Sequence, residues 1–230
     1  MAAWNYWTED KLSRLTLPLR RRRVELFVRE LRLRATDVVL DLGSEDGSYL
    51  ATCYPWPQNI VIADIREAPL RRGVAQFGLK GFILLPTRGR LPITDREFAA
   101  VWCNSVIEHV TVERSELSQV SDKDFRRLAD EHQREFAREI ARIGRRYFVQ
   151  TPYLHFPLEA HSWLPCEQYL AQPLRWRAAR WLKHLWIKQW SADSLLYDCR
   201  RFREHFPDAT RILVERLCLL PKSLIAVRRL

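Results

Sequence analysis

Short apolar runs alternate with segments of helical periodicity along most of the chain. Five of these runs have the pattern of buried strands: Asp37–Leu42, Asn59–Asp64, Phe82–Leu85, Ala99–Cys103 and Tyr147–Gln150. Two more, Arg211–Leu217 and Ser223–Val227, are expected to form an antiparallel pair joined by a turn at Leu220–Lys222. Strands that alternate with helices are typical of βαβ units around a mostly parallel sheet.

Helix signals fall between these strands. The pattern predicts a helix over Leu19–Leu33, a short one after Gly47, and another from about Pro69 to Gly78. Proline suits a first helical turn and glycine a helix end, which sets the limits of the third helix. A further helix is expected before the last two strands.

The strongest helix signal covers Asp122–Ile143. Its apolar stripe recurs at steps of three or four residues and consists of Phe125, Leu128, His132, Phe136, Ile140 and Ile143. Gly144 follows where a C-terminal cap belongs. Seven strands with interleaved helices fill the 230 residues without a repeat or a convincing linker, so the sequence predicts one domain over residues 1–230.

Composition narrows the class of protein. Hydrophobic residues make up 47% of the chain, which argues against disorder, and no run approaches the roughly 20 apolar residues of a membrane-spanning helix. The five cysteines are scattered and odd in number, which fits a reducing compartment without disulfides or zinc. Met1–Asp10 lacks the features of a signal peptide. We expect a cytoplasmic protein.

The net charge of +10 leaves several partners open. The excess is concentrated at Arg20–Arg23 and across Arg175–Lys188. A basic protein attracts nucleic acid, anionic lipid or acidic substrates, although each cluster could equally be a solvated helix face.

Candidate chemistry begins where the first strand ends. Gly43 and Gly47 stand four apart in a turn that leads into a helix, a setting that lets backbone approach a ligand. Their spacing differs from G-x-G-x-x-G, so a nicotinamide or flavin cofactor fits badly. Asp64 ends the second strand about 20 residues later, where a carboxylate can accept hydrogen bonds from a ribose diol.

The ordered motifs resemble class I S-adenosylmethionine-dependent methyltransferases, and by eye the type 11 methyltransferase domain. They comprise Asp41-Leu42-Gly43 with Gly47, Ala63-Asp64-Ile65, Leu91-Pro92-Ile93, Val101–Val110, Phe148–Pro152, Phe156–His161, Phe206–Ala209 and Pro221–Val227. The resemblance spans roughly residues 35–228. It implies a Rossmann-like α/β fold: a seven-stranded, mostly parallel sheet with an antiparallel last strand and helices on both faces.

The resemblance also implies roles for single residues. Asp41, Gly43, Ser44 and Gly47 would line the methionine end of S-adenosylmethionine. Asp64 would hold the ribose hydroxyls, with Ile65 and Leu91 against the adenine. Asn104 and Ser105 would face the sulfonium and its methyl group.

Three positions depart from the family pattern. Glu45 stands where the family has the middle glycine of the first loop, which leaves the width of the turn open. Thr87 occupies the place of an aspartate near the adenine amine, and Ala99 that of an aspartate in the fourth strand. The first two put the strength of donor binding in question, whereas the third is expected to matter for structure only.

Glu108 and His109 follow the fourth strand. In related quinone O-methyltransferases a glutamate three residues earlier completes a divalent-metal site, and Ser105 stands at that position here. With two of three ligands left, we expect no metal. His109 could be the general base for a methyl acceptor, because its pKa suits proton transfer, or it could brace the loop.

The segment Thr151–Pro165 follows the fifth strand and should lie at the carboxyl edge of the sheet, where ligands bind in open α/β folds. Its polar side chains predict an acceptor pocket made of Tyr153, His155, Glu159 and His161. His161 is the better base candidate. The other interpretation is a rigid cover packed on the sheet edge.

Pro173–Trp190 combines tryptophan with arginine and lysine. Ala178, Trp181, Leu182, Leu185 and Trp186 can share one helical face, opposite Arg177, Arg180, His184 and Lys188. This composition is typical of helices that lie in a membrane interface, so a peripheral membrane contact and a lipid-linked acceptor are one interpretation. A lid helix packed on the domain is another. Nucleic acid comes last, because no RNA-binding motif accompanies the helix.

These observations predict in-line methyl transfer to a small-molecule or lipid-linked acceptor. The alternatives are a non-catalytic S-adenosylmethionine- or nucleotide-binding regulatory protein, and an enzyme for another nucleotide-derived ligand. Four parts are expected: an N-terminal helical lid (1–34), a cofactor-binding half (35–150), an acceptor-side loop with the basic helix (151–194) and a C-terminal helix with hairpin (195–230). The oligomeric state stays open, with Trp4, Tyr6 and Trp7 as lid or interface residues.

Overall fold

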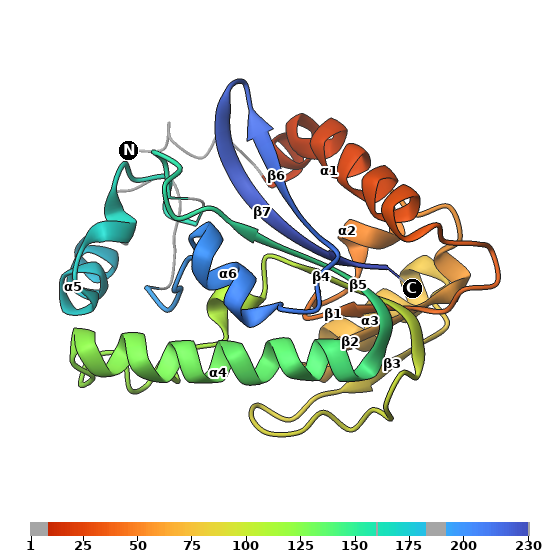
Figure 1. The fold of residues 1–230 in the computed structure, drawn as a ribbon, viewed down its shortest axis with the longest axis horizontal. Coiled ribbons are helices and arrows are strands. Elements are labelled where there is room, and N and C mark those ends of the chain that lie inside the picture. The colour runs from red at the N-terminus through yellow and green to blue at the C-terminus, as the bar shows by residue number, and fades with distance from the viewer. Residues whose placement is uncertain (1–8, 160, 183–191, 230) are drawn as a thin grey trace.

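One sheet runs through the molecule (Figure 1). The computed structural model describes the backbone of residues 9–159, 161–182 and 192–229, and side chains from residue 17 onward within these ranges. The strands are β1 (Val39–Leu42), β2 (Ile60–Asp64), β3 (Gly81–Leu84), β4 (Phe98–Asn104), β5 (Gly144–Pro152), β6 (Arg211–Leu217) and β7 (Leu220–Arg228). Their order is β3-β2-β1-β4-β5-β7-β6. Neighbours among β1 to β5 pair in parallel, and β7 is antiparallel to β5 and β6.

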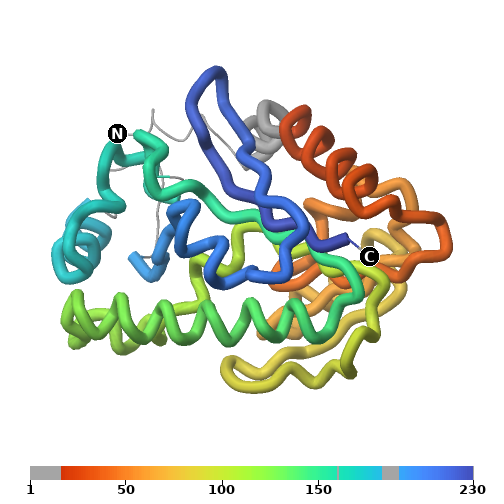
Figure 2. The backbone as a smooth tube through the Cα atoms, in the orientation of Figure 1, coloured from red at the N-terminus to blue at the C-terminus, as the bar shows by residue number. Residues whose placement is uncertain are grey.

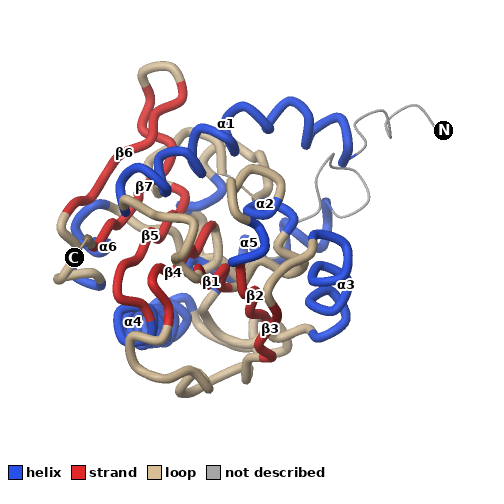
Figure 3. The backbone as a smooth tube through the Cα atoms, turned by 90° about the vertical axis from the view of Figure 1, so that its right-hand side faces the viewer, coloured by secondary structure: helices blue, strands red, loops and turns tan. Residues whose placement is uncertain are grey.

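Helices cover both faces of this sheet (Figure 3). They are α1 (Glu9–Leu31), α2 (Ser48–Ala51), α3 (Glu67–Phe77), α4 (Asp122–Ile143), α5 (Gln172–Leu182) and α6 (Cys199–His205), with short 3-10 turns η1 (Pro57–Asn59), η2 (Ile107–His109) and η3 (Glu167–Tyr169). Because successive strand residues point to opposite faces, Val39 packs with α1, α2 and α3, whereas Leu40 packs with α4 and α6. The predicted Rossmann-like α/β architecture is confirmed.

The helix α4 begins and ends where its sequence pattern predicts, and Ser121 caps it by accepting a hydrogen bond from the Asp124 N–H. The line of buried residues along α4 is shifted by about one residue from the predicted apolar stripe. Its members are Phe125, Ala129, Gln133, Ala137, Ile140 and Ile143, whereas Leu128, His132 and Phe136 are half-buried. Ala137 packs against the sheet and Ala129 against Val112 and Leu195, and these small residues let the helix approach its neighbours closely while the larger side chains flank the contact.

Two further boundaries differ from prediction. The turn between β6 and β7 is Cys218-Leu219 instead of Leu220–Lys222, because Leu217 and Leu220 still pair across the hairpin. The hairpin lies beside α1, which begins ten residues before the predicted start (Figure 2). The predicted basic helix is described only as far as Leu182. Its remainder, and Trp4, Tyr6 and Trp7, lie outside the described residues. No helix in the described ranges is long and apolar enough to cross a membrane.

Candidate functional site

The parallel strands bring the predicted site residues to one edge of the sheet. Leu42 at the end of β1 pairs with Ala63 of β2, and Asn104 of β4 pairs with Gln150 of β5. The loops that follow these strands therefore meet at the carboxyl edge, where open α/β sheets bind their ligands.

The turn after β1 depends on left-handed backbone. Gly43 and Gly47 have φ values of 79° and 71°, and Glu45 between them has 59°. A Cβ at Gly43 would lie 2.5 Å from Val106 Cγ1, and one at Gly47 would lie 2.6 Å from Ile62 Cγ2. Both glycines thus pack the turn against its neighbours. Glu45 adopts the left-handed conformation that glycine reaches at lower free-energy cost. The departure from the family pattern therefore leaves the backbone path of the turn unchanged.

Asp41 carries a buried carboxylate at this turn. The residue is 1% exposed, and neither carboxylate oxygen has a hydrogen-bond partner within the described residues. Burial, together with the nearby charges of Asp46 and Asp64, outweighs the contact with Ser44 and raises the pKa of Asp41 to about 8. The Ser44 hydroxyl beside it is also buried. An unpaired carboxylate of this kind fits the cationic end of a ligand.

Asp64 is held in place by the backbone of both junctions. Its carboxylate accepts hydrogen bonds from the N–H groups of Glu45 at 3.0 Å and Arg66 at 3.1 Å. The Arg66 guanidinium forms an exposed ion pair with Glu45. Each carboxylate oxygen can accept more than one bond, so Asp64 can still receive a ribose diol. Ile65 follows and is 54% exposed, and its contact with adenine stays a prediction.

Leu91, Asn104 and Ser105 already have partners. The Leu91 N–H donates to Glu139 Oε2 at 2.8 Å and its side chain is buried in the core, so a contact of its backbone with adenine would compete with this bond. Ser105 Oγ donates to Gln150 Oε1 at 3.3 Å. Asn104 Oδ1 accepts from Arg23 Nη1 at 2.7 Å. The predicted roles of these three residues stay predictions.

Arg23 is a site residue that the sequence pattern missed. Its side chain is 10% exposed and reaches from α1 to Glu215 of β6, and to Gln150 Oε1 at 3.2 Å. Arg21 and Arg22 are exposed to solvent. The arginine run predicted a charged surface, and nothing in the run itself marks Arg23 as a member that forms an ion pair across the fold.

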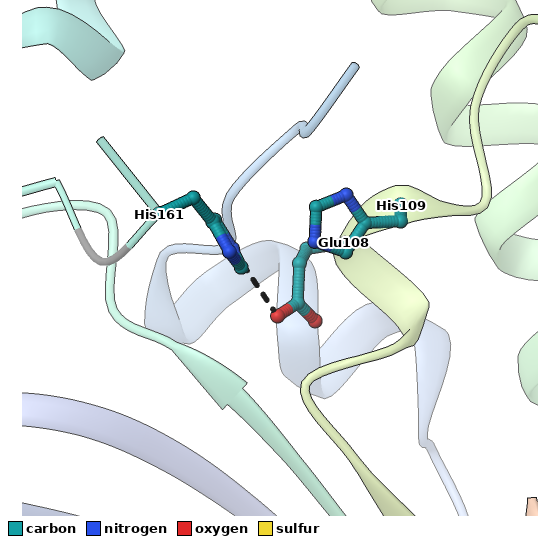
Figure 4. Close-up of side chains that lie close together, drawn as sticks. All are labelled: Glu108, His109 and His161. Atoms are coloured by element: carbon teal, nitrogen blue, oxygen red, sulfur yellow. Dashed lines mark ion pairs between the residues drawn. The ribbon is translucent and has the colours of Figure 1, made fainter. Parts of the chain in front are cut away.

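Beyond β4 the structure brings together residues from two distant loops (Figure 4). Glu108 is fully buried, and its Oε1 lies 3.6 Å from Nε2 of His161, which comes from the loop after β5. The rings of His109 and His161 lie 4.4 Å apart between centroids. The sequence predicts Glu108 and His109 as one candidate and His161 as another, and the fold joins them.

The charges of this cluster support one another. Burial opposes ionisation of Glu108, but the contact with His161 and the charge of His109 outweigh it and lower the pKa of Glu108. Burial likewise opposes charge on His109, but its hydrogen bond to Asp193 and the charges of Glu108 and Asp193 raise its pKa. The His109 Nδ1 lies 2.9 Å from Asp193 Oδ1. Asp193 carried no signal in the sequence, because it lies outside every motif.

The remaining predicted acceptor residues divide into two groups. Glu159 is buried, and its Oε2 accepts the backbone N–H groups of His161 and Ser162, so it shapes the loop that carries His161. His155 is exposed, and its Nδ1 lies 2.9 Å from the Tyr169 hydroxyl, with Tyr153 against its ring. The acceptor roles of these side chains stay predictions.

A cavity of about 150 Å³ is lined by residues outside the glycine turn. Leu154, Gln172 and Arg201 are among its lining residues. It lies between the start of α4, the loop after β5 and the start of α6. The predicted donor site at the glycine turn, Asp41 and Asp64 does not coincide with this cavity.

Comparison with known proteins gives the fold. No family model and no curated protein matches the sequence. An S-adenosylmethionine-dependent methyltransferase from Aquifex aeolicus matches in structure with a TM-score of 0.50 and 15% identity, over 96% of this chain and 98% of that chain. The chain has a methyltransferase fold. The type 11 subgroup stays a prediction.

Two further structures support the methyltransferase fold. A chain of the complex between the Haloferax volcanii Trm112 methyltransferase activator and a putative methyltransferase matches with a TM-score of 0.55 and 14% identity, over 97% of this chain and 96% of that one. The 1,6-didemethyltoxoflavin-N1-methyltransferase of Burkholderia thailandensis, solved with S-adenosylhomocysteine, matches with a TM-score of 0.52 and 12% identity, over 97% and 82%.

Proposed function

We propose that the protein is an S-adenosylmethionine-dependent methyltransferase that acts on a small-molecule or lipid-linked acceptor. The observation that carries the proposal is the unpaired, buried Asp41 carboxylate at the glycine turn, one strand away from the oriented carboxylate of Asp64. On a methyltransferase fold these two groups fit the cationic and the ribose ends of one ligand.

The residues of the glycine turn and of the loop after β5 have different roles in this proposal. When bound, S-adenosylmethionine supplies a methyl group already activated by its sulfonium. Asp41 and Ser44 contact the methionine end of S-adenosylmethionine. Asp64 accepts hydrogen bonds from its ribose hydroxyls, and Ile65 packs against its adenine. The acceptor lies between the loop after β5 and η2, where Glu108, His109 and His161 meet. The acceptor atom attacks the methyl carbon in line as the bond to sulfur breaks, and alignment without water supplies most of the acceleration.

A lipid-linked acceptor is supported by apolar side chains around α5. Tyr169, Leu170, Leu174 and Trp181 are 52%, 41%, 52% and 77% exposed. Leu174 and Trp181 are seven residues apart and share a helix face. We propose a peripheral membrane contact at this face of a protein located in the cytoplasm.

Titration calorimetry with S-adenosylmethionine and S-adenosylhomocysteine tests the proposal. We expect dissociation constants in the micromolar range, about −8 kcal/mol of binding free energy. Asp64→Ala should abolish binding, because the ribose hydroxyls lose their acceptor. The matched control is Glu67→Ala, an exposed carboxylate three residues away that pairs with Arg71, and it should bind as the wild type does.

The outcomes separate the alternatives. Absence of binding at roughly millimolar ligand, or unchanged affinity in Asp64→Ala, contradicts the proposal and leaves an enzyme for another nucleotide-derived ligand. Binding without transfer of a labelled methyl group to any small-molecule or lipid fraction of a cell extract favours the non-catalytic regulatory protein.

A further inference from the structure

Three side chains that can ligate a metal converge just beyond the carboxyl end of β4 (Figure 4). Glu108 and His109 belong to η2, and His161 belongs to the loop after β5. Their ligand atoms all lie within 4.8 Å of one another. The expectation of no metal rested on a pair without a third ligand, and the path of the loop supplies a third candidate.

The carboxylate of Glu108 is buried, and only one of its two oxygens accepts a hydrogen bond. Its Oε2 accepts a hydrogen bond from Thr151 Oγ1 at 3.1 Å, whereas its Oε1 has no hydrogen-bond partner within the described residues. The His161 Nε2 that faces Oε1 is also buried and has no hydrogen-bond partner within the described residues. Their separation of 3.6 Å is too long for a normal hydrogen bond. It is close to the roughly 3.0–3.5 Å between two ligands that share one ion at about 2.1 Å each.

A second carboxylate orients His109. Nδ1 of His109 lies 2.9 Å from Oδ1 of the buried Asp193, whose Oδ2 accepts from Arg114 Nε at 2.9 Å. A hydrogen bond at Nδ1 places the ring N–H there and leaves the lone pair on Nε2. Metal-bound histidines carry the same kind of carboxylate partner on their second nitrogen.

We propose that Glu108, His109 and His161 bind one divalent transition-metal ion whose remaining coordination positions are open. Two imidazoles and one carboxylate suit Zn²⁺, Fe²⁺, Co²⁺ or Mn²⁺ better than Mg²⁺ or Ca²⁺, which prefer oxygen ligands. Three protein ligands leave room for a small molecule to coordinate, as at catalytic zinc sites. The two histidines are thus ligands and not general bases.

The chemistry of the open position rests on the proposed function and specifies its acceptor. Glu108 follows three residues after Ser105, so the ion lies on the side of the site where the methyl group is expected. A hydroxyl bound to the ion has a lowered pKa and loses its proton to solvent. Its oxygen then attacks the methyl carbon. The new O–C bond forms as the S–C bond breaks, and the electron pair stays on sulfur. The acceptor is therefore a hydroxyl compound.

Metal titration of the full-length protein tests the site without turnover. The chain is stripped with a chelator and titrated with Co²⁺, followed by visible absorption and calorimetry. We expect one Co²⁺ per chain with micromolar affinity or tighter. His161→Ala, Glu108→Gln and Asp193→Asn should each weaken Co²⁺ binding by roughly tenfold or more. His161 and Asp193 lie in loops, and circular dichroism checks that each variant is folded.

The matched control is His155→Ala in the same loop. Because His155 is exposed and its Nδ1 contacts the Tyr169 hydroxyl, its removal should leave the Co²⁺ affinity unchanged. No binding at roughly millimolar Co²⁺, Zn²⁺ and Mn²⁺, or equal affinity of wild type and His161→Ala, overturns the site. S-Adenosylhomocysteine is titrated into the same samples. Its binding without Co²⁺ binding rejects the metal site alone, whereas the reverse rejects the methyltransferase and keeps the metal site.

Discussion

We expect the carboxylate of Asp41 to make S-adenosylmethionine binding depend on pH. With its pKa near 8, Asp41 is mostly protonated at pH 7 in the free protein. A cationic ligand favours the ionised form and releases the proton on binding. The affinity for S-adenosylmethionine should therefore rise with pH, by up to about tenfold per unit between roughly 6 and 7.5.

Calorimetry across this pH range measures that dependence, and Asp41→Asn is its control. The asparagine keeps the shape of the side chain but cannot ionise, so its affinity should be lower and nearly independent of pH. A flat profile in the wild type, or the same slope in Asp41→Asn, would show that Asp41 does not face the cationic end of the donor.

Single residues differ in how far the sequence reveals them. The places of Gly43 and Asp64 in the fold could be predicted, because a strand, a turn and a second strand fix their positions through short stretches of chain. His161 was found as a candidate, but its meeting with Glu108 depends on a loop whose path is set by tertiary contacts such as the Glu159 turn. Arg23 was missed, because a run of arginines gives no periodic signal for the one that is buried.

At the scale of elements, periodicity predicted the strands and α4 well, and it left open whether the apolar face of the basic helix is packed or exposed. Trp181 of that face is 77% exposed in α5. The buried residues of α5 are Gln172 and Arg175, and the Arg175 guanidinium contacts Glu167 at 2.9 Å and the Ser194 carbonyl at 2.7 Å. A charge that finds partners can be buried, so α5 is fixed through a basic residue and leaves Trp181 in solvent.

This arrangement predicts that α5 binds anionic membranes. Leu174 and Trp181 can enter the interface while the exposed Arg177 and Arg180 attract anionic headgroups. The protein should co-sediment with anionic vesicles at low salt, less with neutral ones. The Leu174→Ser, Trp181→Ser double variant should bind at least about tenfold more weakly, because burying such side chains contributes roughly 1.5–3 kcal/mol each.

Leu219→Ser is the matched control for the membrane assay. Leu219 is 86% exposed at the tip of the β6–β7 hairpin, so its removal lowers surface hydrophobicity without touching α5. If wild type stays in the supernatant with anionic vesicles at low salt, or if Leu219→Ser weakens binding equally, α5 is not a membrane-binding helix.

At the scale of the whole molecule, the strand order follows from the chain being a succession of βαβ units with a hairpin at its end. Matches over 96% and 97% of the chain at 12–15% identity show that this order tolerates nearly complete change of sequence. What the pattern could not predict is how the two ends of the chain meet, since the contact between α1 and β6 joins residues 192 positions apart. Such contacts leave no local periodicity.

That contact should stabilise the whole fold. Arg23 forms an ion pair with Glu215 and donates to Asn104 and Gln150, so Arg23→Met would leave a half-buried carboxylate without its cation and the Asn104 amide oxygen without this donor. We expect a loss of about 2–4 kcal/mol in the free energy of unfolding, measured by urea denaturation.

The control is Arg22→Met, at the exposed neighbour, which should change the free energy of unfolding by less than about 0.5 kcal/mol. Combining Arg23→Met with Glu215→Leu should recover part of the loss, because the unpaired carboxylate is removed. If Arg23→Met is as stable as Arg22→Met, other contacts hold α1 against the hairpin, among them apolar packing and the ion pair between Glu30 and Arg229.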